Sequence, residues 1–281
     1  MQRGVEGIAV REIGGRMKLA RFRVNELESY GRVEGTEVRA IQGSIFGEHT
    51  VSQTAYPLEQ VKLLPPTQPA SFWAVGLNYA AHVAHQEGAL DAERIRREAG
   101  MFRPWQKGVG CIIGHGDSIV LPPEADYVHY EGELVIVIGK PARRVTPEEA
   151  PHFILGYTCA NDVSSEGSWS KDLTNWRKKG CDTFGPVGPW IETEVDPHGL
   201  EIITRLNGKE HDRGSTSGMT HDCYAIVSGI SQFVTLHPGD LILTGAPGAV
   251  EALHPGDVVE IEIPGIGTLS NPVVAEKNEA S

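Results

Sequence analysis

Three carboxylates beside two apolar segments are the residues of this sequence best placed to do chemistry. Glu131 and Glu133 come just before the apolar run 134–138, and Asp162 follows the apolar run 153–160. The first run is apolar throughout and rich in β-branched residues, so it predicts a strand covered on both faces. Residues two apart on a strand share a face, so Glu131 and Glu133 point the same way. If the two runs pair as strands, Asp162 lies at the end of the second strand, close to the two glutamates.

Three like charges placed this close repel one another unless something neutralises them. A hard divalent cation does so, because Mg²⁺, Mn²⁺ and Ca²⁺ prefer oxygen ligands and leave coordination positions for water or substrate. A second interpretation is that the acids only cap two strands in solvent, since charged side chains usually stay wet. The sequence that flanks the three acids favours the metal site.

The elements that must position these acids fall into two regions. Alternating segments such as 18–24, broken by glycines, predict a small β-rich N-terminal domain over residues 1–66. Within it, residues 1–16 are a candidate disordered extension. A proline-rich stretch at 64–69 predicts a linker. We therefore expect residues 67–281 to form a second domain, which would be the catalytic, metal-binding one because it contains the three acids.

The second region is predicted to be mainly sheet with few helices. Pro-Gly-Asp recurs at 238–240 and 255–257, each time before an apolar run rich in β-forming residues, and the Asn-Gly pair at 207–208 predicts a type I′ hairpin turn. Apolar residues at helical spacing predict one helix over 222–233, with Phe233 on its apolar face. The charged, alanine-rich segment 80–100 predicts a surface helix or a lid.

Composition narrows the function. The chain has 281 residues, 40% of them hydrophobic, and a formal net charge of −12, which disfavours nucleic acid and anionic membranes as partners. The sequence contains no apolar stretch near the roughly 20 residues that span a bilayer. The N-terminus lacks the apolar core of a secretory signal, so the expected compartment is the cytoplasm. Four widely spaced cysteines, without a Cys-x-x-Cys pair, are expected to be reduced and packed.

A set of motifs in a fixed order carries a family resemblance. These motifs are Gly-Leu-Asn-Tyr at 76–79 with His82, Tyr130-Glu131-x-Glu133-Leu134, Gly-Tyr-Thr at 156–158, Asn161-Asp162-Val163-Ser164, the segment from Lys179 to Trp190, Asn-Gly at 207–208, Thr-Gly-x-Pro at 244–247 and Pro-Gly-Asp at 255–257. From about residue 70 to 274 the chain resembles the fumarylacetoacetate hydrolase family. The resemblance implies an α+β, mainly β fold, a mixed β-sandwich roll of the fumarylacetoacetate hydrolase C-terminal type with few helices.

The resemblance also implies a site and a chemistry. It places a divalent cation on Glu131, Glu133 and Asp162, the family's basic residue near the substrate on Lys179, and the chain in a homodimer. The family's reactions are carbon–carbon bond hydrolysis, decarboxylation, hydration and keto–enol isomerisation of 2-oxo acids and β-dicarbonyl compounds. Without the motif after it, Lys179 would instead be one member of a solvated basic cluster at 177–179.

Elementary chemistry agrees with that assignment. A small anionic 2-oxo acid offers a carboxylate oxygen and a carbonyl oxygen that chelate one cation, and the cation stabilises the enolate formed when a neighbouring bond breaks or a proton leaves. We therefore expect an enzyme that depends on Mg²⁺, with Mn²⁺ and Ca²⁺ as alternatives. The expected reaction is hydrolysis of a carbon–carbon bond or isomerisation in the breakdown of aromatic compounds.

The general base is where this sequence departs from the family's pattern. Hydrolysing and decarboxylating members commonly carry His-x-x-Glu on the lid, where Glu orients His to activate water. Here the positions read His82-Val83-Ala84-His85, so His82 is the first candidate base and His85 the second. Glu87 lies five positions after His82, which is a poor facing distance on a helix. Two histidines alone make a weak case for zinc.

Further departures concern the substrate. After Asp162-Val163-Ser164, this chain has Ser165-Glu166 where the family usually has a small residue and Arg, so positive charge is lost. The resemblance also implies that Ala246 replaces the family's Thr, which donates a hydrogen bond to the substrate carboxylate. Two interpretations of Trp169 and Trp176 are open, in which they line an apolar pocket for a larger substrate or pack in the fold. A second hypothesis is therefore a family member that binds metal, has lost the chemistry and acts as a binding or structural dimer.

Overall fold

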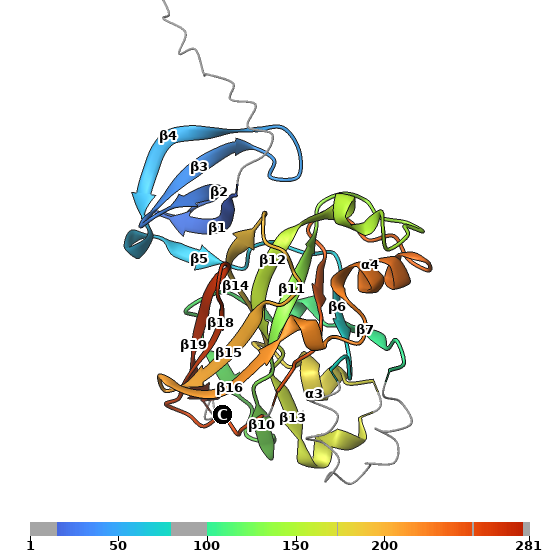
Figure 1. Cartoon of the computed structure of the whole chain (residues 1–281). Coiled ribbons are helices and arrows are strands. Elements are labelled where there is room, and N and C mark those ends of the chain that lie inside the picture. Colours follow the sequence, from blue (N-terminus) through green and yellow to red (C-terminus); the bar gives the residue numbers. More distant parts are fainter. Residues whose placement is uncertain (1–15, 80–99, 173, 249, 278–281) are drawn as a thin grey trace, which may run out of the picture.

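The computed structural model describes residues 16–79, 100–172, 174–248 and 250–277 (Figure 1). Most of these residues lie in mixed β-sheets, and the described part of the chain contains two α-helices, α3 (Trp176–Gly180) and α4 (Cys223–Ser231). The expected fold class, mainly β with few helices, is therefore confirmed. Neither of these helices is long and apolar enough to cross a membrane. The helix or lid expected over 80–100 lies almost wholly outside the described residues.

The largest sheet is built from strands that come from the whole length of the chain. They are β1 (Lys18–Val24), β2 (Leu27–Glu34), β3 (Glu37–Gly43), β4 (His49–Pro57), β5 (Lys62–Leu64), β6 (Phe72–Val75), β7 (Pro104–Lys107), β8 (Ile112–Ile113), β11 (Gly132–Ile138), β12 (Ile154–Asn161), β14 (Gly185–Glu192) and β17 (Leu241–Leu243). Their order is β4-β3-β2-β1-β14-β12-β11-β17-β6-β7, while β5 pairs with β1 and β8 with β14. The two strands that carry the acids, β11 and β12, are thus neighbours near the middle.

A second sheet and a short ribbon complete the architecture. The second sheet has the order β16-β15-β18-β19-β9, and the ribbon pairs β10 with β13. Their bounds are β9 (Ile119–Leu121), β10 (Tyr127–His129), β13 (Ser164–Glu166), β15 (Glu201–Leu206), β16 (Lys209–Ser215), β18 (Val258–Ile263) and β19 (Gly267–Ala275). Asn207 and Gly208 both have positive φ between β15 and β16, which confirms the predicted hairpin turn.

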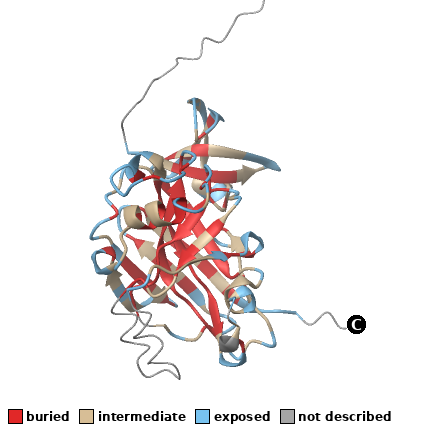
Figure 2. Ribbon diagram, turned by 90° about the vertical axis from the view of Figure 1, so that its right-hand side faces the viewer, coloured by how far each residue is buried: buried red, intermediate tan, exposed pale blue. Residues whose placement is uncertain are grey.

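The two sheets pack closely where the acids lie. Every residue of β11 is buried, and Figure 2 shows buried residues running through the middle of the molecule. A Cβ on Gly132 would lie 2.7 Å from Thr204 Oγ1 and 2.9 Å from Ile261 Cδ1, both on the second sheet. The glycine in Glu-Gly-Glu therefore lets one face of β11 meet the second sheet, while both acids point away from it.

The N-terminal strands extend the large sheet. β1 pairs with β14 through Lys18 opposite Glu192 and Leu19 opposite Ile191, so β1 to β4 continue it at one end (Figure 1). They also bury a small apolar cluster of their own, made of Ala20, Phe22, Val33 and Val38. The division into domains at residues 66 and 67 remains a prediction.

Helix α4 follows the predicted pattern except at its end. The Asp222 carboxylate accepts hydrogen bonds from the backbone N–H groups of Tyr224 and Ala225, which fixes the start of the helix. Ile226 and Ile230 are buried as expected. The expectation for Phe233 was wrong, because the helix ends at Ser231 and the Phe233 side chain is 85% exposed.

Candidate metal centre

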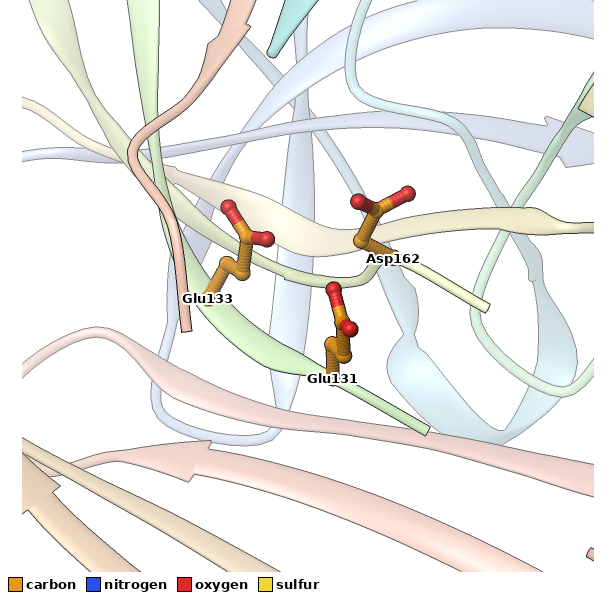
Figure 3. Close-up of side chains that lie close together, drawn as sticks. All are labelled: Glu131, Glu133 and Asp162. Carbon is orange, nitrogen blue, oxygen red and sulfur yellow. The ribbon is translucent and has the colours of Figure 1, made fainter. Parts of the chain in front are cut away.

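The three carboxylates come together because β11 and β12 are antiparallel neighbours. Gly132 lies opposite Asn161, so the start of β11 adjoins the end of β12. Glu131, just before β11, and Asp162, just after β12, therefore lie at the same end of this strand pair. The expected pairing of the two runs is therefore present. Oxygen atoms of Glu131, Glu133 and Asp162 all lie within 4.8 Å of one another (Figure 3).

All three acids are buried. Glu131 is 8% exposed, and Glu133 and Asp162 are each 2% exposed. The interpretation of these acids as solvated caps is therefore wrong, because the strands and the residues around them exclude most of the water. Buried carboxylates this close need compensating charge.

Two lysines supply part of that charge. Lys179 Nζ donates to Glu131 Oε2 at 2.7 Å and to Asp162 Oδ2 at 2.5 Å, and its side chain is only 12% exposed. Its interpretation as a solvated residue is therefore wrong. Lys107 Nζ donates to Asp162 Oδ1 at 2.5 Å from a fully buried side chain.

Sequence analysis missed Lys107. It is the last residue of the short edge strand β7, where it pairs with Phe72 of β6, and 55 positions separate it from Asp162 in the sequence. The only local signal is its alternation with Trp105, which places two large side chains on one face of β7. That pattern does not distinguish a buried lysine from a surface one.

The pKa values of Glu133 and Asp162 show that the lysines compensate the charges of these two acids unequally. Burial raises the pKa of Glu133 well above its usual value, and the negative charges of Asp162 and Glu131 raise it further. Burial also acts to raise the pKa of Asp162, but the charges of Lys107 and Lys179 outweigh it and hold that pKa at about 2. The lysines thus satisfy Asp162 and leave Glu133 short of positive charge. A buried all-oxygen set with this deficit fits a hard divalent cation.

Two motifs of the sequence form a clamp that orients Glu133. The backbone N–H of Gly245 donates to Glu133 Oε2 at 2.6 Å. Gly245 has a φ of +95°, and a Cβ there would lie 3.0 Å from Asn78 Cβ, so the position requires glycine. Asn78 Nδ2 donates to the Thr244 carbonyl oxygen at 2.8 Å and to that of His221 at 2.9 Å. The Gly-Leu-Asn-Tyr and Thr-Gly motifs are thereby joined beside the acids.

The remaining residues singled out from the sequence lie in different places. His82 and His85 are outside the described residues. Ala246 is 8% exposed on the segment that holds Glu133. Trp169 is also 8% exposed, whereas Trp176 is 68% exposed, so only Trp169 packs in the fold. The guanidinium of Arg177 lies 5.2 Å and 5.8 Å from the centres of these two rings.

Comparisons with known proteins agree with this geometry. A family model described as fumarylacetoacetate (FAA) hydrolase C-terminal matches residues 71–274, and one described as Rv2993c-like, N-terminal, matches residues 17–66. The structure of 5-carboxymethyl-2-hydroxymuconate delta-isomerase from Mycobacterium smegmatis is 40% identical, with a TM-score of 0.83 over 92% of this chain and 100% of that one.

Two further relatives carry other reaction names. The mitochondrial oxaloacetate tautomerase Fahd2a of Rattus norvegicus is 36% identical over 78% of this chain and 71% of its own length. Maleylpyruvate hydrolase from Sphingobium, solved in complex with manganese(II) and pyruvate, is 27% identical, with a TM-score of 0.75 over 93% of this chain and 100% of that one. One fold therefore accompanies an isomerase, a tautomerase and a hydrolase.

Proposed function

The chain belongs to the fumarylacetoacetate hydrolase family, and we propose that it is a divalent-metal-dependent enzyme that acts on a 2-oxo or enol acid through an enolate. The observation that carries the proposal is the buried set of Glu131, Glu133 and Asp162, whose oxygens lie within 4.8 Å of one another. Such a set is costly to maintain without a ligand that needs it.

We assign these three carboxylates as the metal ligands. Mg²⁺ is the proposed resident ion, and Mn²⁺ and Ca²⁺ are the alternatives, because all three prefer carboxylate oxygens. When bound, the cation would supply a Lewis acid that stabilises an enolate.

Lys179 and Lys107 have two tasks in this proposal. Their ammonium groups touch Asp162 and keep it ionised, as its pKa of about 2 indicates. They also bring positive charge into a buried site of a protein with a net charge of −12, which favours an anionic substrate and the negative charge that develops on its carbonyl oxygen. Lys179 is the one proposed to contact the substrate, because its side chain is 12% exposed whereas that of Lys107 is fully buried.

The proton carrier is proposed to be His82, with His85 as the second candidate. In the family's His-x-x-Glu pattern the glutamate orients the histidine toward water, and in this sequence that position is His85. We therefore propose isomerisation by proton transfer first and hydrolysis of a carbon–carbon bond second. The 40% identity to a delta-isomerase supports the same order.

The test is turnover of a small substrate panel, followed by ultraviolet absorbance with Mg²⁺ and with a chelator. The panel contains oxaloacetate, acetylpyruvate, fumarylpyruvate and a 2-hydroxymuconate-type dienoate. The parent chain is compared with Glu133→Gln, which removes a proposed ligand charge, and with Glu48→Gln, which makes the same change at an exposed turn. We expect one chromophore to disappear in a metal-dependent way in the parent and in Glu48→Gln, and at least about 100-fold more slowly in Glu133→Gln.

The outcome also separates the two hypotheses. Silence on the whole panel, together with metal binding that Glu133→Gln abolishes, would favour the non-catalytic, metal-binding dimer. The homodimer itself is a separate proposal, tested by the mass of the particle in solution.

A further inference from the structure

A ladder of paired residues leads from the three acids to the surface. On β10 and β13, His129 lies opposite Ser164 and Tyr127 lies opposite Glu166. Tyr127 and His129 share a face of β10, and Ser164 and Glu166 share a face of β13. Glu131 comes two residues after β10, and Asp162 comes two residues before β13. The ladder is buried at His129 and Ser164, and it opens at Tyr127, which is 39% exposed.

Glu166 lies at the exposed end of these paired strands, and the His129 ring lies between its carboxylate and that of Glu131. His129 Nδ1 lies 3.9 Å from Glu131 Oε1, and His129 Nε2 lies 3.8 Å from Glu166 Oε1. One imidazole ring therefore separates the carboxylate of Glu166 from that of a proposed metal ligand. The Glu166 side chain remains 36% exposed.

The position of Glu166 is fixed by its neighbours. The turn after it, at the start of the 3₁₀-helix Gly167–Lys171, is held by Asp126 Oδ2, which accepts a hydrogen bond from the Ser168 N–H at 2.9 Å. Gly167 has a φ of +77° in that turn. These contacts fix the backbone next to Glu166, and its carboxylate lies beside His129 and Lys178.

Glu166 also neutralises a lysine beside the site. Its carboxylate forms an ion pair with Lys178, the neighbour of Lys179 on α3. Of these two adjacent lysines, one contacts Glu131 and Asp162 and the other is neutralised at the rim. Burial and the charges of Glu251 and Glu166 raise the pKa of Tyr127, in agreement with a negative potential at this end.

We propose that Glu166 determines substrate charge, so that the enzyme prefers a 2-oxo or enol acid whose end remote from the 2-oxo acid group is uncharged. This inference rests on the proposed function and names its substrate class. A second carboxylate at the remote end would approach Glu166, and it would find Lys178 already paired. An uncharged acyl or alkyl end meets neither obstacle.

The test compares two substrates that share a 2,4-dioxo acid head. Acetylpyruvate has an uncharged remote end, and fumarylpyruvate ends in a carboxylate. We expect the parent to show the higher kcat/KM with acetylpyruvate. In Glu166→Gln, the ratio of kcat/KM for fumarylpyruvate to that for acetylpyruvate is expected to rise about threefold, because the Glu166 charge is partly exposed and therefore screened.

A double-mutant cycle identifies the cation responsible. The rise should disappear in Glu166→Gln combined with Lys178→Gln, because the freed ammonium of Lys178 is what would receive the remote carboxylate. Glu48→Gln is the matched control and should leave the ratio unchanged. An unchanged ratio in Glu166→Gln, or a rise that survives the loss of Lys178, would overturn the inference.

A binding measurement keeps this inference separate from the proposed function. If neither substrate is turned over by any variant, the proposed function fails on these compounds. The same preference should then appear in the shift of the unfolding midpoint that each compound causes in the presence of Mn²⁺. Equal shifts from both compounds in the parent and in Glu166→Gln would overturn the inference on its own.

Discussion

Replacing Lys107 should show how much stability the protein loses when a buried acid has one positive partner fewer. Its ammonium lies 2.5 Å from Asp162 Oδ1, and both side chains are buried. Lys107→Met leaves that carboxylate with one partner fewer in a dry site, so we expect the metal-free protein to lose about 3 kcal/mol of unfolding free energy. Urea unfolding in the presence of a chelator measures this loss.

The matched control is Lys62→Met. Lys62 pairs with Asp117 at 2.6 Å, but its side chain is 52% exposed, so losing that pair should cost less than about 1 kcal/mol. Losses of equal size in the two variants would mean that the contact between Lys107 and Asp162 contributes little.

Glu133 and Asp162 should give the metal-free protein opposite dependences on pH. The raised pKa of Glu133 means that the folded protein holds its proton more tightly, so this contribution is complete below the usual value of 4.5 and is lost as pH rises through the raised pKa. The lowered pKa of Asp162 gives a contribution that is present above its usual value of 3.8 and is lost as pH falls toward about 2.

A divalent cation should remove the loss at higher pH, because it binds the deprotonated carboxylate. We therefore expect the shift of the unfolding midpoint caused by Mg²⁺ to grow as pH rises above 4.5, and to grow much less in Glu133→Gln. Thermal unfolding at a series of pH values, with Mg²⁺ or with a chelator, measures this. A shift that does not vary with pH would contradict the charge deficit at Glu133.

At the scale of elements, β12 leads directly into Asp162, and it packs closely against β14. A Cβ on Gly156 would lie 2.3 Å from the Glu192 carbonyl oxygen and 2.8 Å from Ile191 Cγ2. Gly156→Ala should therefore push the two strands apart, lowering both stability and metal affinity. The control is Gly110→Ala, because a Cβ at Gly110 meets no atom within 4 Å. Calorimetric titration with Mn²⁺ and urea unfolding test the pair, and unchanged affinity in Gly156→Ala would show that the site does not depend on this packing.

Local patterns were sufficient for elements whose own residues decide their structure. The apolar run 134–138 makes up most of β11, and β12 is mostly apolar. The Asn-Gly pair at 207–208 permits the positive φ angles of its turn. The same holds for α4, which Asp222 caps.

Contacts between residues far apart in the chain could not be read in this way. Lys107 reaches Asp162 across 55 positions, and Asn78 reaches Thr244 across 166. The pairing of β1 with β14 spans a similar distance. Each of these contacts exists only once the sheet has assembled. The sequence motifs could therefore be recognised, but the contacts that hold Glu133 and the burial of Lys107 could not be predicted from them.

At the scale of the whole molecule, the question is whether the N-terminal strands unfold together with the rest of the chain. β1 to β4 bury their own small cluster, which would suit a separate domain over residues 1–66. Yet β1 is hydrogen-bonded to β14, and Leu19, Ile41 and Ile45 belong to the main core. Because unfolding the N-terminal strands would uncover the edge of β14 and part of that core, the two regions should unfold together.

We therefore expect calorimetry of the full chain to show a single transition, and Mg²⁺ to move the whole of it upward, although the proposed ligands all lie after residue 66. Glu133→Gln should remove that movement and keep the single transition. Two transitions, of which Mg²⁺ moves only one, would show instead that the chain divides energetically near residue 66. In that case the hydrogen bonds between β1 and β14 would join two domains without coupling their stability.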